Sequence, residues 1–140
     1  MLIKLGNNEI NLDQGLLKFD EHTINKFLQN FASNYNTYCE AHSDAQFIHS
    51  RFEDTYDALY SGKFRQYREE SSSDKVAEMK TKSDTEVQEA LENVRVAKRN
   101  VNLIYGYLRS MDRAHDDAIT TCHNMRKELD KLFPSYVKRE

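Results

Sequence analysis

The chain contains little that would bend or interrupt a helix. Among its 140 residues there are one proline and four glycines, and there is no tryptophan. Proline and glycine are the residues that most disfavour helix interiors, so their scarcity indicates a largely helical chain. No stretch reaches the roughly 18 apolar residues that a membrane-spanning helix requires, and residues 1–12 lack the basic start and apolar core of a secretion signal. We therefore expect no membrane partner and a cytoplasmic location.

Cysteine is also scarce, with only Cys39 and Cys122 present. Two cysteines in a chain of this length do not make a disulfide framework, and we expect both thiols to be reduced. Charged residues make up 31% of the chain and the mean hydropathy is -0.83. These values are typical of elongated helices with much exposed surface. The length predicts a single domain over residues 1–140.

An apolar repeat of seven residues runs through the last third of the chain. Its two sets of positions are Val87, Val94, Val101, Leu108, His115, Cys122 and Leu129, and Leu91, Ala97, Ile104, Met111, Ala118, Met125 and Leu132. This is the a/d pattern of a coiled coil. It predicts a helix over residues 83–133 that begins at a Ser83–Glu86 capping box and ends before Pro134. Residues 134–140 are predicted to form a tail.

A second heptad ladder, richer in aromatic residues, predicts a first long helix over residues 20–60. Its positions are Ile24, Phe31, Tyr38, Ala45, Phe52 and Leu59, and Asp20 and Thr23 are candidate N-caps. A long narrow helix cannot bury its apolar seam alone. We therefore expect an all-α protein, an antiparallel hairpin or coiled coil of long helices, that associates further into an oligomer.

The first nineteen residues are predicted to form a small β-hairpin or arm. Two short alternating runs flank Gly6-Asn7-Asn8, which is a turn sequence. An isolated two-stranded hairpin is marginally stable in water. We expect this hairpin either to pack on a helix or to pair with another chain.

Ser61-Gly62 is predicted to end the first helix and to open a basic loop over residues 61–82, in which Asp74–Lys82 forms a short helix. Basic residues alternate with Phe64 and Tyr67 there. Phosphates can bind to such charges while bases stack on the rings, as in proteins that bind single-stranded nucleic acid. A solvated linker is the alternative interpretation. The predicted DNA-binding residues are Arg51, Lys63, Arg65, Arg68, Lys75, Lys80 and Lys82.

A second basic region lies inside the last predicted helix. Residues 95–113 hold five Arg or Lys residues and one acidic residue, a local excess that can attract phosphate even on a chain with a net charge of -3. The alternative interpretation is the ordinary charged back of a coiled coil.

The sequence shows no catalytic or metal-binding arrangement. His115 and Cys122 share a helix face but lie two turns apart, roughly 10 Å, which is too far for one metal ion. We expect no catalytic residues, no bound metal and no cofactor, and hence a protein that is not an enzyme.

The order of these features resembles the UvsY family of phage recombination mediators. The resemblance covers residues 20–132 and rests on the turn Leu59-Tyr60-Ser61-Gly62-Lys63, and on Glu78-Met79-Lys80-Thr81 with Ser83-Asp84 just before the last helix. It implies a protein of DNA recombination and repair, located in the host-cell cytoplasm if encoded by a bacteriophage. Such a mediator binds single-stranded DNA as a ring-shaped homo-oligomer, for which a heptamer is one size the resemblance allows.

The resemblance also implies two protein partners. The family helps to load a RecA-like recombinase onto strands that single-strand binding protein already covers. The alternative function, which follows from the heptads and the net acidity, is a non-enzymatic coiled-coil scaffold, chaperone or inhibitor that acts through protein–protein contacts.

Overall fold

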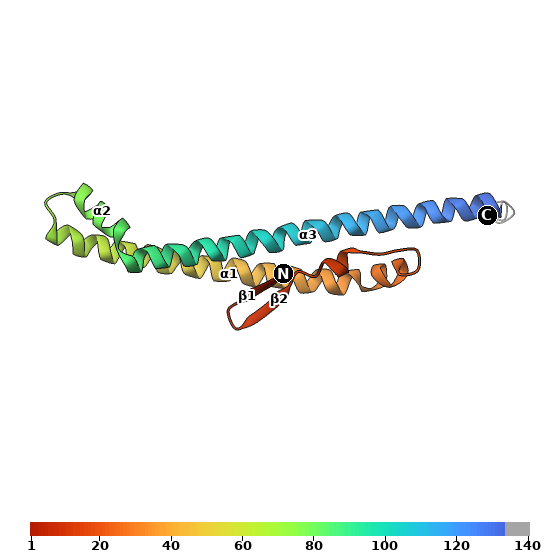
Figure 1. The fold of residues 1–140 in the computed structure, drawn as a ribbon, viewed down its shortest axis with the longest axis horizontal. Helices are drawn as coiled ribbons and strands as arrows, with labels where there is room; N and C mark the ends of the chain where they lie inside the picture. The colour runs from red at the N-terminus through yellow and green to blue at the C-terminus, as the bar shows by residue number, and fades with distance from the viewer. Residues whose placement is uncertain (134–140) are drawn as a thin grey trace.

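Two long antiparallel helices form the body of the protein (Figure 1). The structure, a computed structural model, describes residues 1–133, so the predicted tail at 134–140 lies outside the described residues. Strands β1 (Leu2–Leu5) and β2 (Asn8–Asn11) and a short 3-10 helix η1 (Gln14–Leu17) precede helices α1 (Ile24–Glu70), α2 (Asp74–Ser83) and α3 (Thr85–Leu132). The predicted antiparallel hairpin of long helices with a small N-terminal β-hairpin is confirmed.

Asp20 prepares the start of α1. Its carboxylate accepts hydrogen bonds from the backbone N–H groups of His22 (2.8 Å) and Thr23 (2.9 Å), and these bonds hold its pKa below the ordinary value. The Thr23 hydroxyl accepts a bond from the Asp20 N–H (2.8 Å) instead of capping the helix itself. Both predicted N-cap residues therefore shape this helix end, and the helix begins at Ile24.

The predicted loop at residues 61–82 is wrong over its first part, because α1 continues through Ser61-Gly62 to Glu70 and only Ser71–Ser73 separate it from α2. The short helix predicted at Asp74–Lys82 is confirmed as α2. A glycine inside a helix costs about 1 kcal/mol relative to alanine. Beyond Gly62, however, Lys63, Phe64 and Tyr67 are partly buried, and α2 folds back along α1 (Figure 1). Tertiary packing thus outweighs the local preference for a break.

The N-cap of the last helix lies one residue after the predicted Ser83, and the helix itself begins at Thr85. Asp84 is the N-cap of α3, and its Oδ1 accepts hydrogen bonds from the N–H groups of Glu86 (2.9 Å) and Val87 (3.3 Å). Ser83 instead ends α2 and donates its hydroxyl to the Met79 carbonyl (2.9 Å). The Ser83 capping box is therefore wrong, since a carboxylate one residue later provides the cap.

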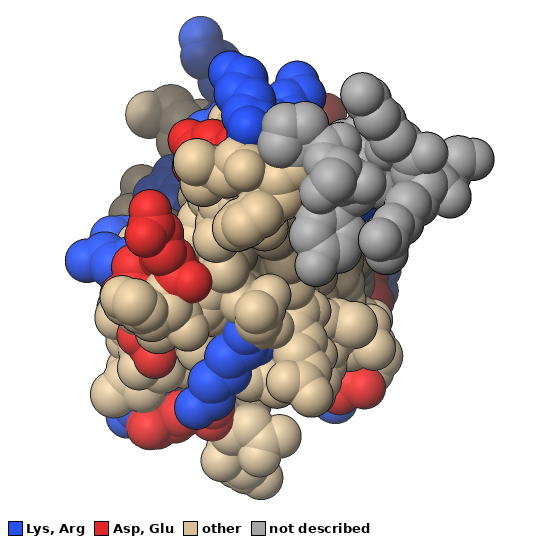
Figure 2. Space-filling view, turned by 90° about the vertical axis from the view of Figure 1, so that its right-hand side faces the viewer, with Lys and Arg blue, Asp and Glu red and all other residues tan. Residues whose placement is uncertain are grey.

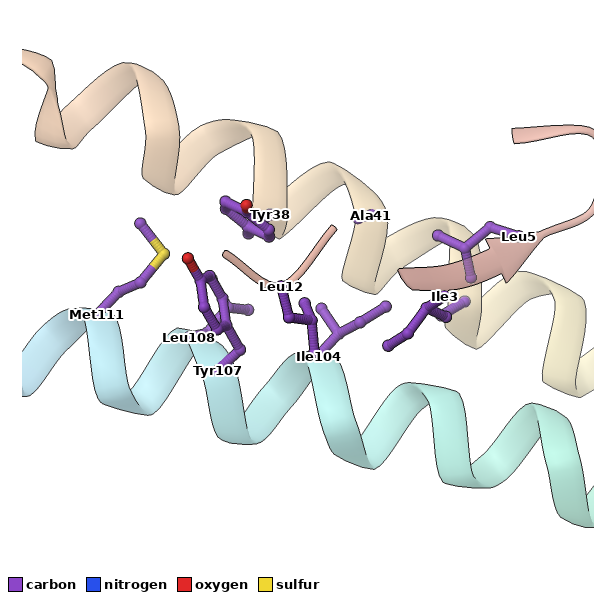
Figure 3. Close-up of a cluster of buried hydrophobic side chains, with 10 residues drawn as sticks. Ile3, Leu5, Leu12, Tyr38, Ala41, Ile104, Tyr107, Leu108 and Met111 are labelled. Carbon is purple, nitrogen blue, oxygen red and sulfur yellow. The ribbon is translucent and has the colours of Figure 1, made fainter. Parts of the chain in front are cut away.

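The N-terminal arm packs across the two long helices. Its strands pair Ile3 with Ile10 and Leu5 with Asn8, and the turn places Gly6 at a φ of 64°, which favours glycine. Side chains alternate between the faces of a strand, so Ile3 and Leu5 reach the core together (Figure 3). The buried cluster contains Ile3, Leu5, Leu12, Tyr38, Ala41, Ala45, Ile104, Tyr107, Leu108 and Met111.

Helix α3 is offset from α1, so its last turns extend beyond the start of α1 (Figure 1). The offset follows from the antiparallel register, in which the rings of Phe31 and His115 lie 4.3 Å apart and those of Tyr38 and Tyr107 lie 4.5 Å apart. Seam positions are buried or partly buried up to Met125, whereas Leu129 and Leu132 are 55% and 72% exposed. Both cysteines are free and partly buried, as expected. None of the helices within residues 1–133 is long and apolar enough to cross a membrane.

Candidate nucleic-acid interface

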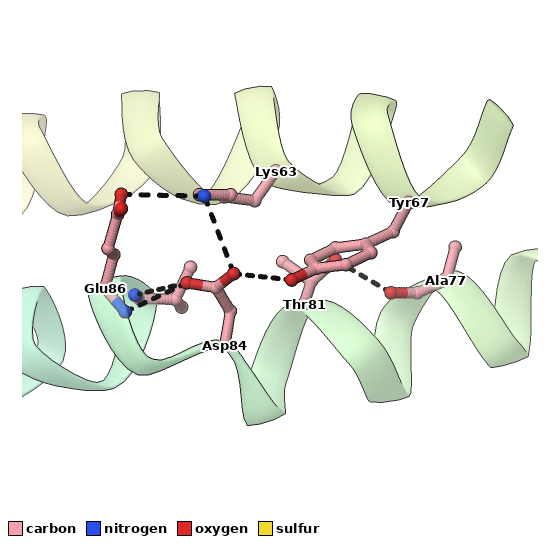
Figure 4. Close-up of polar contacts among 7 residues, drawn as sticks. Lys63, Tyr67, Ala77, Thr81, Asp84 and Glu86 are labelled. Carbon is pink, nitrogen blue, oxygen red and sulfur yellow. Dashed lines mark hydrogen bonds and ion pairs between the residues drawn. The ribbon is translucent and has the colours of Figure 1, made fainter. Parts of the chain in front are cut away.

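Asp84 is the centre of the polar contacts that join α1 to the α2–α3 junction (Figure 4). While Oδ1 caps α3, Oδ2 accepts a hydrogen bond from the Tyr67 hydroxyl (2.6 Å) and lies 3.6 Å from the Lys63 Nζ. The same Nζ lies 3.6 Å from Glu86 Oε2. Two residues that the sequence places in a basic loop, Lys63 and Tyr67, therefore hold the two long helices together.

These contacts shift the pKa values of two side chains at the junction. The hydrogen bond from Tyr67, followed by the backbone N–H groups of α3 and the charge of Lys63, holds the pKa of Asp84 below its ordinary value of 3.8. The same hydrogen bond raises the pKa of the Tyr67 hydroxyl. Only 22% of the Lys63 side chain is exposed. A phosphate would therefore have to compete with two carboxylates for this lysine.

Two further predicted DNA-binding residues also form ion pairs within the chain. The Arg68 guanidinium donates through Nε to Asp74 Oδ1 (2.5 Å) and through Nη1 to the Ser71 carbonyl (3.0 Å), which fixes the α1–α2 turn. Lys82 Nζ lies 2.8 Å from Glu78 Oε1, and this contact raises the pKa of Lys82. Exposed ion pairs of this kind contribute little to stability, but they reduce the positive charge that the turn presents.

The remaining predicted residues are exposed. Arg65 on α1, and Lys75 and Lys80 on α2, have no ion pair within the described part of the chain. Arg51 lies over the Phe47 ring at 5.8 Å. It is twelve residues before Lys63 on the same helix, or about 18 Å along the axis. The structure therefore brings six of the seven predicted residues to one end of the hairpin and leaves Arg51 apart.

One open hollow on α1 combines rings with basic groups. Tyr60, Phe64, Arg65 and Arg68 line it together with Ser61 and Glu69, and its volume is about 480 Å³. This pairing of rings and guanidinium groups is the one that single-stranded nucleic acid requires. Acidic side chains offset the charge nearby: residues 63–86 contain six Lys or Arg and six Asp or Glu.

The acidic partners of the turn are what sequence reasoning missed. Asp84 and Glu86 are neighbours of Lys63 only because α2 reverses the chain, and nothing in the local sequence signals that contact. The second basic region, residues 95–113, lies in the middle of α3, separate from the turn. Among residues 1–133 no group of three or more His, Cys, Asp or Glu side chains is placed to hold a metal ion.

Comparisons of the chain with models of protein families, with curated proteins and with solved structures find no match.

Proposed function

We propose that this protein is a recombination mediator. In this proposal it binds single-stranded DNA as a homo-oligomer and helps to load a RecA-like recombinase onto strands covered by single-strand binding protein. The observation that carries the proposal is the form of the hairpin, a thin rod with an uncovered apolar seam at one end and basic side chains at the turn and along α3. The order of sequence motifs, which resembles that of the UvsY family, supplies the link to recombination.

The uncovered seam supports self-association. The heptad pattern that is buried between α1 and α3 continues without change through Met125, Leu129 and Leu132, where α1 is absent. The accessible surface of the chain is 10530 Å², whereas a compact monomer of this mass exposes about 7,500 Å². A second copy of α3 presents the same a/d pattern and is therefore the partner that fits this seam.

An oligomer changes what each weak DNA site can achieve. Several copies present several basic surfaces, and a strand held by one surface meets the next at high effective concentration. Affinity then comes from the number of phosphate contacts and not from a single pocket. A mediator also has to release the strand to a recombinase, and many individually weak contacts allow stepwise release.

The test measures fluorescence anisotropy of a labelled oligothymidylate titrated with the protein at several salt concentrations, with the native mass determined in parallel. We expect an oligomer whose affinity falls steeply with salt, because log K changes by ~0.7 per phosphate contact for each unit of log salt. A second measurement follows the release of fluorescent single-strand binding protein when a RecA-like recombinase is added, with and without the protein. A flat anisotropy baseline at low salt would contradict the proposal.

The exposed seam also favours a second candidate, a coiled-coil scaffold, chaperone or inhibitor that acts through protein contacts alone. This candidate predicts a defined oligomer without DNA affinity. The same titration separates the two functions, because only the mediator requires salt-dependent binding.

A further inference from the structure

The outer face of α3 carries a row of arginines that take no part in the polar contacts at the α1–α2 turn. The row consists of Arg95, Arg99, Arg109 and Arg113, whose successive spacings are four, ten and four residues. Because each residue turns an α-helix by about 100°, the four side chains fall within one sector of roughly 80° around the helix axis. The buried side chains of the same stretch, such as Ala97, Ile104 and Met111, lie on the opposite side of the helix. All four arginines are exposed and face away from α1.

The charges of this row are largely uncompensated. Within residues 1–133, Arg99, Arg109 and Arg113 form no ion pair, and the Arg95 Nη1 reaches Glu92 only at 4.0 Å, with both side chains about two-thirds exposed. Residues 93–111 contain no Asp or Glu, and Asp112 is the one acidic residue between Arg95 and Arg113. Viewed from the C-terminal end of α3, Lys and Arg side chains project from the upper side of the molecule, whereas Asp and Glu lie among further Lys and Arg on its left and lower sides (Figure 2).

The middle of the row is open. Asn102 and Gly106 stand between the two arginine pairs, and nothing lies within 4 Å of the position that a Cβ on Gly106 would occupy. A hollow of about 300 Å³ adjoins them, lined in part by Leu12, Leu103 and Ser110. The backbone of a nucleic-acid strand can therefore come close to α3 between Arg99 and Arg109.

An exposed ring borders the row. Tyr105 is 52% exposed, and the Arg109 guanidinium lies 5.9 Å from the centre of its ring. The same ring lies near His42 of α1, with centroids 5.9 Å apart. The ring is held in place and still presents part of its surface to solvent, which suits stacking of a nucleobase.

We propose that this arginine face, defined as Arg95, Arg99, Asn102, Gly106, Arg109 and Arg113, binds the phosphates of single-stranded nucleic acid, with Tyr105 beside it for a base. The inference deepens the proposed function and rests on it. It places the main DNA contact on α3 and not at the α1–α2 turn. The guanidinium fork matches phosphate oxygens in a bidentate manner. The row is ~27 Å long, a length that fits successive phosphates of an extended strand and not one acidic side chain.

The first test compares three triple variants that each remove the same positive charge. The Arg99 variant combines Arg99→Gln, Arg109→Gln and Arg113→Gln on the arginine face. The Lys4 variant combines Lys4→Gln, Lys18→Gln and Lys26→Gln on the arm and the start of α1. The Arg65 variant combines Arg65→Gln, Lys75→Gln and Lys80→Gln at the α1–α2 turn. We expect the first variant to lose about tenfold or more in affinity for labelled oligothymidylate. Its slope of log K against log salt should fall by up to ~2, whereas the Lys4 variant should keep the wild-type slope.

The second test places one charge in the open middle of the face. Gly106→Glu and Gly106→Gln add side chains of nearly equal size at a position where a Cβ meets no atom, and both replace glycine by a better helix former. Both should therefore keep the helical circular dichroism signal. We expect the Glu variant to bind several-fold more weakly than the Gln variant, because only Glu repels phosphate.

The outcomes separate this inference from the proposed function. Absence of binding by the unaltered protein at low salt contradicts both. Binding with an unchanged slope in the Arg99 variant, or with a loss confined to the Arg65 variant, overturns the arginine face alone. A change in native mass of the Arg99 variant would also overturn it, because the face would then be a contact with an acidic surface of another copy. Equal affinities of the Gly106→Glu and Gly106→Gln variants would overturn it independently.

Discussion

At the scale of single residues, Asp84 shows how one side chain can have several structural roles. It caps α3 through Oδ1, while Oδ2 accepts the Tyr67 hydroxyl and lies near the Lys63 ammonium. The sequence places Asp84 beside a helix start, which local pattern can indicate. It gives no sign of Tyr67 or Lys63, which lie seventeen or more residues earlier and meet Asp84 only after the chain reverses.

The lowered pKa of Asp84 predicts a stability that depends on pH. Because the pKa is lower in the folded protein than the ordinary value of 3.8, this carboxylate stabilises the fold above pH 4 or so. That contribution disappears as the pH falls through the lowered pKa. We expect Asp84→Asn to melt at a lower temperature than the unaltered protein at neutral pH, although asparagine remains a good N-cap.

Thermal melts of both proteins from neutral to acidic pH, followed by circular dichroism, check this prediction. The difference in melting temperature should shrink toward the acid end, where the unaltered carboxyl is also protonated. A difference that stays constant over the whole range would mean that charge does not explain the role of Asp84.

At the scale of elements, the N-terminal arm acts as a clasp across α1 and α3. Tyr38 of α1 donates its hydroxyl to the Asn11 carbonyl and Tyr107 of α3 donates to the Asp13 carbonyl, both at 2.6 Å. Between these bonds Leu12 is 5% exposed. A two-stranded hairpin is marginally stable alone, so packing on the helices supplies the stability that its own strands lack.

Leu12→Ala tests the clasp. Truncation of a buried leucine typically costs about 2–5 kcal/mol in the free energy of unfolding, and we expect a value toward the lower end because the arm lies at the surface. Chemical denaturation followed by circular dichroism measures it. Leu2→Ala is the matched control, since Leu2 is 67% exposed and should change the free energy by less than about 0.5 kcal/mol. Equal effects of the two substitutions would rule out the clasp.

At the scale of the whole molecule, the offset between the long helices leaves the end of α3 without a partner helix. The seam there has the same a/d spacing as the buried seam, and water-exposed Leu129 and Leu132 remain on it. Burial of such side chains is worth about 1.5–3 kcal/mol each. Burial of this seam against a second copy would therefore favour the self-association that we propose.

Leu129→Asp with Leu132→Asp should reduce the native mass to that of a monomer, because a charged seam cannot be buried against a second copy. Lys127→Asp is the control, since it adds a carboxylate on the opposite side of the same helix turn. Sedimentation or light scattering gives the mass. An assembly that survives the double substitution would show that the copies meet elsewhere.

The sequence by itself determined the elements and the seams of this protein. The scarcity of proline and glycine, the two heptad ladders and the Gly6 turn predict long helices and a small hairpin, because each depends on local periodicity and on backbone preference. The positions of the basic residues along α3 also follow from the sequence alone, since the helix period fixes which residues share a face.

Tertiary structure decided the limits of the elements and the availability of the charges. Packing at Lys63, Phe64 and Tyr67 carries α1 past Gly62, whose local preference favours a break. The reversal of α2 pairs Lys63 with Asp84 and Glu86, whereas the one ion pair described for the arginines on the outer face of α3 is the 4.0 Å contact between Arg95 and Glu92. Which arginine remains free depends on contacts between residues far apart in the chain, and periodicity carries no information about those contacts.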